Sequence, residues 1–262
     1  AYMGDGINDA PAMKAADVSI SVDTAVDIAK KSADIILLHK DLRILERAVQ
    51  IGRQVFGNAM KYIKITLSSN FGNILSILVA SSFLPFLPML PIQLLILDLM
   101  YGTSCLSIPF DTMNRHYLSE PRKWSTKKLP KFMFYFGPTS SIFDILTFAI
   151  LFFVVCPQVV GTSYAGATAS QKLLFSLVFS AGWFIESLWT QEMVIHALRD
   201  PRVPFIKQHA TAIVTWSTIS MAVIGTALPF ITPIAKAMKF GPIPVYFLAV
   251  VFILLVLYIA LT

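Results

Sequence analysis

Six long apolar segments dominate the sequence and limit what it can fold into. They cover residues 62–84, 91–110, 132–156, 171–195, 210–230 and 242–262. Each has about 20 residues or more, and a helix of that length, rising ~1.5 Å per residue, crosses the ~30 Å hydrocarbon core of a bilayer. We therefore predict a bundle of six transmembrane helices over residues 62–262, in which the linker 85–91 makes a tight hairpin.

Composition agrees with a membrane protein surrounded by lipid. The chain is 56% hydrophobic and 14% charged, whereas soluble domains are about 45–50% apolar and about 25% charged. The net charge of +6 comes from basic residues in short segments between apolar runs, which indicates loops and argues against nucleic-acid binding. Cys105 and Cys156 lie in or beside apolar runs, so we expect small buried side chains and no disulfide or metal pair.

Basic residues also predict the orientation of the spans. Segments 111–131 and 196–209 together hold nine lysines and arginines, whereas 85–91 and 157–170 hold none and 231–241 holds two. Cytoplasmic loops are enriched in Lys and Arg. We therefore expect both termini in the cytoplasm and the chain in the cell membrane, which is the inner membrane if the source is Gram-negative.

The first 61 residues are different in character. Strand-like runs at 18–22 and 34–38 alternate with helical stretches at 11–16 and 24–32. Two short strands with helices between them cannot bury a core alone, so we expect residues 1–41 to end a larger cytoplasmic domain of a longer protein. Residues 42–61 have an apolar face opposite charges and run without a break into the first span, which we interpret as a stalk helix.

The most specific motif is Gly-Asp-Gly-Ile-Asn-Asp-Ala-Pro-Ala-Met-Lys at residues 4–14. Glycines on either side of Asp5 allow a sharp turn that exposes its carboxylate. Asp5 and Asp9 can then face one site, with the amide of Asn8 between them. Such a set suits Mg²⁺, which prefers oxygen ligands, and a phosphoryl group. The alternative is an Asx-turn that caps the next helix.

This motif resembles the Gly-Asp-Gly-x-Asn-Asp-Ala-Pro-Ala-Leu signature of P-type ATPases. The resemblance implies that residues 1–41 are the C-terminal piece of a haloacid-dehalogenase-like α/β phosphorylation domain. It also implies that Asp5 coordinates the catalytic Mg²⁺ and that Asn8 contacts the phosphoryl group. Asp9, which supports the loop, counts with Asn8 as catalytic and with Asp5 as part of the metal site. Gly4 and Gly6 shape the loop around the cofactor.

Other parts of that family are not in this sequence. The phosphorylated aspartate of the family lies in Asp-Lys-Thr-Gly-Thr, which does not occur here, and the nucleotide-binding domain, the actuator domain and the first four spans are also missing. We therefore expect ATP and Mg²⁺ to be cofactors of a complete pump, whose N-terminal part is the partner of this chain. The 262 residues alone should neither hydrolyse ATP nor pump.

Acidic residues inside the apolar segments are further candidates, because each costs about 2.5–3.5 kcal/mol even on lenient insertion scales. Asp98, Asp144 and Glu186 lie well inside spans, and Glu192 lies nearer an end. Structural roles are the alternative. Asp144 can bond to hydroxyls nearby in sequence, at positions 139 and 140, and the two glutamates can lean toward cytoplasmic water or cap helix contacts.

The first two spans hold the predicted ion site. Asn70 and Asn73 share a helix face, where polar groups can also simply join helices. They resemble the ion-lining positions of the fifth span of cation pumps, and residues 62–91, 136–146 and 202–206 resemble the magnesium branch. That branch reads Asn-Leu-Leu-Tyr-Asp in its sixth span, and the Asp is an ion ligand. Here Asp98 stands at the Asn position, so the carboxylate is displaced ~6 Å along the helix from the Asp position. Gly102 stands at the Asp position, where it would ease unwinding and free backbone carbonyls.

We therefore predict a mainly α protein made of a phosphorylation-domain piece, a stalk helix and six spans. The complete protein is expected to be an ATP-driven pump of the bacterial magnesium-transporting branch, with Mg²⁺ as its transported cation. A Ca²⁺ or H⁺ pump of the same class and a non-catalytic membrane fragment are the alternatives. A phosphatase is disfavoured because the nucleophile region is absent.

Overall fold

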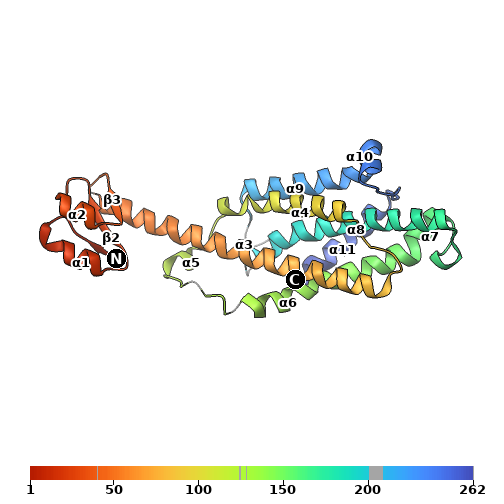
Figure 1. Ribbon diagram of the computed structural model, residues 1–262, viewed down its shortest axis with the longest axis horizontal. Coiled ribbons are helices and arrows are strands. Elements are labelled where there is room, and N and C mark those ends of the chain that lie inside the picture. The colour runs from red at the N-terminus through yellow and green to blue at the C-terminus, as the bar shows by residue number, and fades with distance from the viewer. Residues whose placement is uncertain (40, 124, 128, 201–208, 262) are drawn as a thin grey trace. The chain divides into compact units, whose positions relative to one another are not determined.

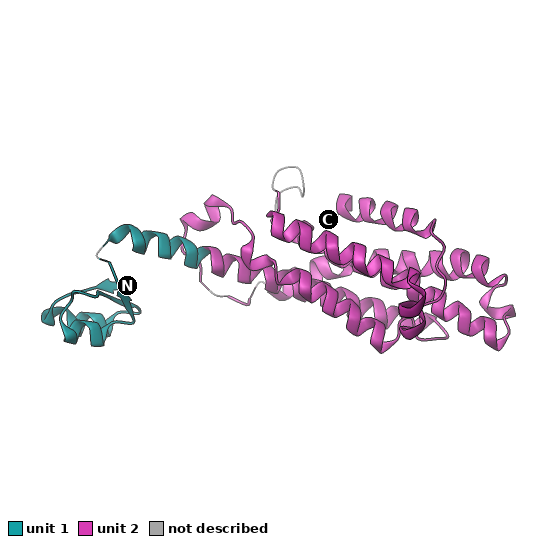
Figure 2. Cartoon of the chain, turned by 90° about the horizontal axis from the view of Figure 1, so that it is seen from above, with its two compact units in different colours: residues 1–53 teal, residues 54–262 magenta. Residues whose placement is uncertain are grey.

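The computed structural model describes residues 1–39, 41–123, 125–127, 129–200 and 209–261. By its internal contacts the chain divides into two compact units, residues 1–53 and 54–262 (Figure 2). The first contains a small parallel sheet. The second contains only helices and loops among its described residues.

The first unit has a three-stranded parallel sheet in the order β1 (Tyr2–Met3), β2 (Ser19–Val22) and β3 (Ile35–Leu37). Its connections contain the 3₁₀ turn η1 (Ile7–Asp9) and the helices α1 (Ala10–Ala15) and α2 (Asp27–Ser32), because parallel neighbours need crossover connections. In the register, Ile20 pairs with both Met3 and Ile35. The small core comprises Met13, Ile20, Val22, Ala25, Ala29 and Leu37.

Strand β1 is the element that the sequence analysis did not predict. It has only two residues before Gly4, too few to show an alternating pattern. The other two strands and both helices occur within a few residues of their predicted positions.

Helix α3 (Leu42–Phe83) is one continuous helix of 42 residues. No proline occurs between positions 42 and 83, and prolines 85, 88 and 91 follow immediately. Since proline cannot continue a helix and restricts the residue before it, the helix ends where this run begins.

The second unit contains the remaining long helices (Figure 1). They are α4 (Pro91–Cys105), α6 (Leu129–Ile150), α8 (Ala169–Leu198), α9 (Ala212–Ala227) and α11 (Phe247–Leu261). Shorter elements join or extend them: η2 (Ile108–Phe110), α5 (Arg115–Ser119), η3 (Leu151–Val155), α7 (Cys156–Val160), η4 (Tyr164–Gly166), η5 (Leu228–Phe230) and α10 (Thr232–Ala237).

Within the described ranges, five helical segments are long and apolar enough to cross a membrane. They are Leu42–Phe83, Pro91–Phe110, Leu129–Val160, Ala169–Leu198 and Ala212–Phe230. They correspond to the first five predicted spans, with ends that differ by up to a few residues, apart from the first, which begins 20 residues earlier. The sixth, at 242–262, contains the shorter apolar helix α11, which starts only at Phe247 because Pro242 and Pro244 precede it.

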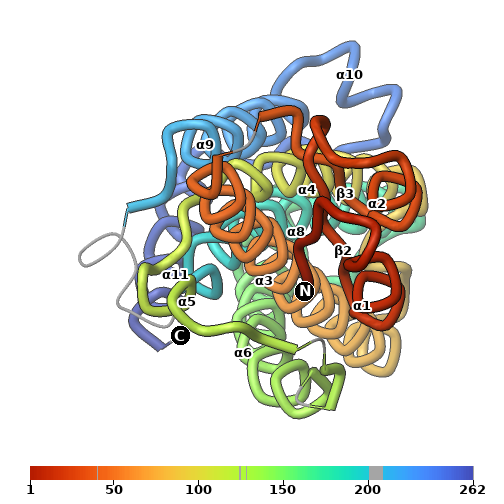
Figure 3. The backbone as a smooth tube through the Cα atoms, turned by 90° about the vertical axis from the view of Figure 1, so that its left-hand side faces the viewer, coloured from red at the N-terminus to blue at the C-terminus, as the bar shows by residue number. Residues whose placement is uncertain are grey.

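Helix α8 is the centre of the second unit. It packs against α4, α6, α9 and α11, and Figure 3 shows these helices around it. Its middle turns are almost fully buried, with Phe179, Trp183 and Phe184 each at most 1% exposed. A helix that is apolar on all sides is expected in such a central position.

Helices α3 and α6 approach closely at two glycines. A Cβ atom on Gly72 would lie 2.3 Å from Ser140 Oγ and 2.8 Å from the carbonyl oxygen of Gly137. Ser141 Oγ donates to the carbonyl oxygen of Gly72 at 2.9 Å. Small residues that let backbones meet, with a hydroxyl hydrogen bond across the gap, are typical of helix contacts in membranes.

Further along, α6 passes into the π-helical segment η3 just before Pro157. A proline removes one helical hydrogen bond and its ring crowds the preceding turn. The wider π turn accommodates this, and the helix continues to Val160.

Candidate functional site

The loop at residues 4–9 follows β1 at the carboxyl edge of the sheet. Gly4 N donates to the carbonyl oxygen of Ile20 at 3.0 Å, and Ser21 Oγ donates to the carbonyl oxygen of Gly4 at 2.9 Å. A Cβ atom on Gly4 would lie only 2.4 Å from Asp9 Cβ. The loop is therefore bonded to the neighbouring strand and closes so tightly that position 4 requires glycine.

Asp9 holds this loop together. Its Oδ2 accepts hydrogen bonds from the backbone N–H groups of Asp5 at 3.1 Å and Gly6 at 3.0 Å, and its Oδ1 accepts one from the Tyr2 hydroxyl at 3.0 Å. The Gly6 N–H, followed by the Tyr2 hydroxyl, lowers the pKa of Asp9 below its ordinary value. The same contact raises the pKa of Tyr2. Asp9 is thus ionised, and both of its carboxylate oxygens accept hydrogen bonds that hold the loop in place.

Asp5 and Asn8 are exposed on the same loop. An exposed carboxylate fits Mg²⁺, which keeps several waters and usually binds through one or two carboxylates. Asp5 would hold the metal, and Asn8 could donate to an anionic ligand beside it. Among the described residues there is no group of three or more His, Cys, Asp or Glu side chains that could hold a metal.

The predicted ion-site residues of the first two spans do not form an enclosed site. Asn70, Asp98 and Gly102 are exposed on α3 and α4, and Asn73 is half-buried. In the described part of the chain, neither asparagine side chain nor the carboxylate of Asp98 makes a hydrogen bond. Polar groups therefore lie on open faces of two apolar helices.

The other intramembrane acids are buried. Asp144 on α6 accepts hydrogen bonds from Ser76 on α3 and Trp183 on α8. These partners lie on neighbouring helices, whereas the hydroxyl of Ser140 donates to Gly137 on its own helix. Glu186 is 0% exposed, and neither of its carboxyl oxygens has a hydrogen-bond partner among the described residues.

Glu192 belongs to a second buried polar group, between α4 and α8. Ser104 Oγ donates to Glu192 Oε1 at 2.8 Å, while Glu192 Oε2 has no hydrogen-bond partner among the described residues. The buried Tyr101 lies on the same part of α4. Ser104 and Tyr101 were not predicted as site residues. Both glutamates are 0% exposed, so the alternative that they lean toward cytoplasmic water is wrong for this arrangement. The bond between Ser104 and Glu192 agrees with the other alternative, a contact between helices.

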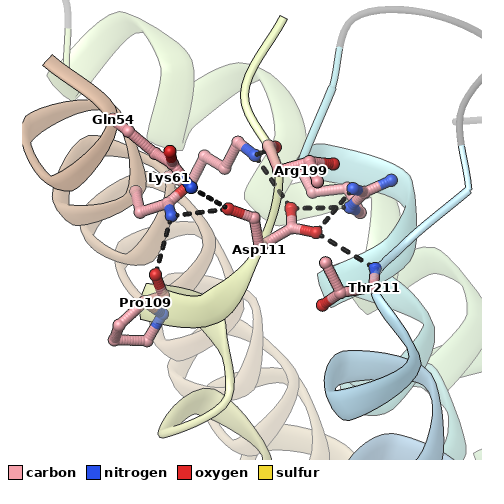
Figure 4. Close-up of polar contacts among 8 residues, drawn as sticks. Gln54, Lys61, Pro109, Asp111, Arg199 and Thr211 are labelled. Atoms are coloured by element: carbon pink, nitrogen blue, oxygen red, sulfur yellow. Dashed lines mark hydrogen bonds and ion pairs between the residues drawn. The ribbon is translucent and has the colours of Figure 1, made fainter. Parts of the chain in front are cut away.

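The sequence analysis also missed a buried charge cluster centred on Asp111, directly after η2 (Figure 4). Lys61 Nζ on α3 lies 2.8 Å from Asp111 Oδ2. The Arg199 guanidinium, just beyond α8, donates through Nε to Oδ2 at 3.0 Å and through Nη2 to Oδ1 at 2.7 Å. The Asp111 side chain is 2% exposed and those of Lys61 and Arg199 are 9% and 4% exposed.

Backbone contacts complete this Asp111 cluster. The Asn58 side chain donates to the carbonyl oxygens of Pro109 at 3.0 Å and Asp111 at 2.8 Å, and the backbone N–H of Thr211 points at Asp111 Oδ1 from 3.4 Å. Burial alone would raise the pKa of Asp111, but hydrogen bonds and charges from Arg199 and Lys61 outweigh it and lower that pKa. The cluster joins α3, the segment after α4, the end of α8 and the start of α9.

Comparison with known proteins agrees with this architecture. Residues 86–262 match the family model of the C-terminus of cation-transporting ATPases. The chain is 49% identical, over 93% of its length, to the Magnesium-transporting ATPase, P-type 1 of Salmonella typhimurium. It is 46% identical, over its whole length, to the protein of the same name from Escherichia coli.

Coverage of these relatives is partial. The chain spans 25% of the Salmonella protein and 28% of the Escherichia coli protein. A calcium-transporting ATPase of Bacillus subtilis is 39% identical over 38% of this chain, so the similarity to magnesium transporters is both higher and more extensive. The chain belongs to the cation-transporting P-type ATPases and corresponds to their C-terminal part, including apolar helices that can span a membrane.

Proposed function

We propose that the complete protein is an ATP-driven pump that moves Mg²⁺ across the cell membrane. The observation that carries this proposal is the 46–49% identity over 93–100% of the chain to proteins named magnesium-transporting ATPases. A Ca²⁺ pump is the second candidate, supported only by the shorter similarity to calcium-transporting ATPases. The fold alone would not separate the two, since one fold can serve several functions.

The loop at residues 4–9 would contribute to phosphoryl transfer. Bound Mg²⁺ would neutralise the charge that develops on the phosphoryl group. Asp5 would hold the ion through its exposed carboxylate, and Asn8 would orient a phosphoryl oxygen. Asp9 would keep the loop closed by accepting hydrogen bonds from its two backbone N–H groups and from Tyr2. In this assignment Asp9 acts as a positioning residue.

The domain organisation of the chain is also part of the proposal. The three-stranded parallel sheet supports the view that residues 1–41 end a haloacid-dehalogenase-like domain. The unbroken α3 supports a stalk over 42–61 that transmits motion to the membrane. With α11 as a short final helix, the membrane domain has six spans, and the basic loops imply cytoplasmic termini.

The transported ion would bind at the open faces of α3 and α4 that carry Asn70, Asn73, Asp98 and Gly102, together called the ion face. The chain covers about a quarter of the length of its relatives, so the N-terminal spans of the complete protein would cover this face. A carboxylate in hydrocarbon is costly, which is a physical reason for Asp98 to be enclosed by protein and cation.

Transport assays on the complete protein test the ion face. In Asp98→Ala, Mg²⁺ uptake into proteoliposomes should be abolished, while phosphorylation from inorganic phosphate should persist. Thr103→Ala is a matched control, because Thr103 is also exposed on α4 and its hydroxyl bonds to its own helix at Leu99. Unchanged Mg²⁺ uptake by Asp98→Ala would refute the site, and uptake of Ca²⁺ alone by the wild type would favour the second candidate.

A further inference from the structure

A pair of carboxyl groups is buried where α3, α6 and α8 meet. Asp144 is 2% exposed and Glu186 is 0% exposed, and their carboxyl groups lie beside each other. Neither belongs to the proposed ion face, whose acid Asp98 is exposed on α4. The pair therefore needs an explanation of its own.

Asp144 is held as a hydrogen-bond acceptor. Trp183 Nε1 donates to its Oδ1 at 2.8 Å, and an indole N–H can only donate. Ser76 Oγ donates to its Oδ2 at 2.6 Å. The other acceptor near that hydroxyl is the carbonyl oxygen of Gly72, at 3.0 Å, which already receives a hydrogen bond from Ser141. Each oxygen of Asp144 therefore has a donor, as an ionised carboxylate requires.

Glu186 has the opposite surroundings. Both of its oxygens are buried, and no described residue donates a hydrogen bond to either of them. A carboxylate that is removed from water and receives no hydrogen bond carries a penalty of several kcal/mol. A protonated carboxyl group carries no charge, and its O–H would find an acceptor in the neighbouring Asp144.

No basic side chain compensates the pair in the described part of the chain. On α8 itself, Lys172 lies over the Tyr164 ring and His196 bonds to Thr218; these are 14 and 10 residues from Glu186, or about 21 and 15 Å along a helix. On α6, Lys131 lies 13 residues from Asp144, or about 20 Å along a helix. On α3, Lys61 pairs with Asp111 and Lys64 lies over the Phe132 ring. The other titratable groups on the helices packed on α8 are acids, thiols and phenols: Asp98, Tyr101 and Cys105 on α4, Tyr135 on α6, Cys156 on α7 and Tyr258 on α11.

We propose that Asp144 and Glu186 form a proton-binding site in which Glu186 carries the proton and donates it to Asp144. Two carboxyl groups side by side in an apolar environment cannot both ionise, so they share a proton. Mg²⁺ fits poorly, because it demands near-octahedral oxygen coordination at about 2.0–2.1 Å and the Trp183 N–H already occupies one oxygen of Asp144. This inference does not depend on the proposed pump.

Infrared spectroscopy of the complete polypeptide in lipid nanodiscs at neutral pH tests the site. The carbonyl band of a protonated carboxylic acid should be present in the wild type and should lose one component in Glu186→Gln. In Asp144→Asn the component should remain but shift, because its acceptor changes from a carboxylate to an amide. The exposed control Glu46→Gln should retain the wild-type spectrum.

Other outcomes would overturn the proposal. Loss of the component in Asp144→Asn but not in Glu186→Gln would place the proton on Asp144. No change in either variant would mean that both acids are ionised. Bound Mn²⁺, detected by electron paramagnetic resonance and lost in Glu186→Gln but kept in Asp98→Ala, would identify a metal site. Glutamine has the shape of a protonated glutamate, so Glu186→Gln should fold. If it does not, Asp144→Asn alone shows which acid carries the proton: a shifted band places it on Glu186, and a lost band places it on Asp144.

Discussion

The loop around Asp9 and the cluster around Asp111 each hold one carboxylate among several donors, but the donors come from different distances along the chain. Those of Asp9 lie three, four and seven residues away. Those of Asp111 lie 50, 88 and 100 residues away. The first arrangement can form within one short segment, whereas the second exists only when four parts of the second unit have packed together.

Burial separates the two sites further. Asp9 is only half-buried and its partners are neutral, whereas Asp111 and its two cations are almost entirely buried. A buried ion pair adds little net stability compared with apolar packing, but removal of one partner is costly because it leaves a charge unpaired. We therefore expect the Asp111 cluster to be the more sensitive of the two sites.

The largest effect is expected for Asp111→Asn, which removes the carboxylate that both Lys61 and Arg199 bond to in the buried cluster. It should destabilise the second unit by about 3–5 kcal/mol, seen as a lower unfolding midpoint of the protein in detergent or lipid. Asp41→Asn is the control, because the ion pair of Asp41 with Arg43, at 3.4 Å, lies between exposed side chains, so this change should alter stability by no more than about 1 kcal/mol. Equal midpoints for the two variants would contradict the importance of the cluster.

A smaller effect is expected in the loop. Gly4→Ala should destabilise it by about 1–3 kcal/mol, because the new Cβ would overlap Asp9. Gly6→Ala is the matched change, since its Cβ would lie 3.4 Å from Asp9 Oδ2, an ordinary contact. Hydrogen exchange of residues 4–9 should be faster in Gly4→Ala than in Gly6→Ala. The same exchange rate in both variants would show that the loop is not as tightly closed as described.

The smallest effect concerns how the stability of the second unit changes at acidic pH. The folded-state pKa of Asp111 is lowered, so its stabilising contribution is present above the ordinary pKa of about 3.9 and is lost as pH falls through the lower, folded value. The difference in unfolding midpoint between wild type and Asp111→Asn should therefore shrink as pH falls below about 4. A difference that stays constant down to pH 2 would contradict this assignment.

The contrast between these sites also shows what the sequence could reveal. The loop motif was visible because Gly4, Asp5 and Asp9 are neighbours in the chain, and the five long spans were visible because apolar length is a local property. The partners of Asp111 were not visible. Arg199 was counted only as a basic loop residue, and Lys61 stands one residue before the first predicted span with no sign of its partner.

Exposure was equally difficult to predict. Asn70 and Asp98 were expected to line a site, but their accessibility depends on which helices cover α3 and α4. For Asp144 the structural alternative was a bond to hydroxyls nearby in sequence, yet its partners Ser76 and Trp183 lie 68 and 39 residues away. Side-chain pairing across helices follows from packing, which periodicity alone does not determine.

Phosphoenzyme formation by Asp5→Asn in the complete protein is the most direct test of the central claim that this chain belongs to a working ATP-driven pump. The proposed function predicts that Asp5→Asn forms little or no phosphoenzyme from ATP and Mg²⁺. Asp17→Asn, also exposed in the first unit, should behave as the wild type. Phosphoenzyme formation by Asp5→Asn at the wild-type level would contradict the role of the loop in phosphoryl transfer.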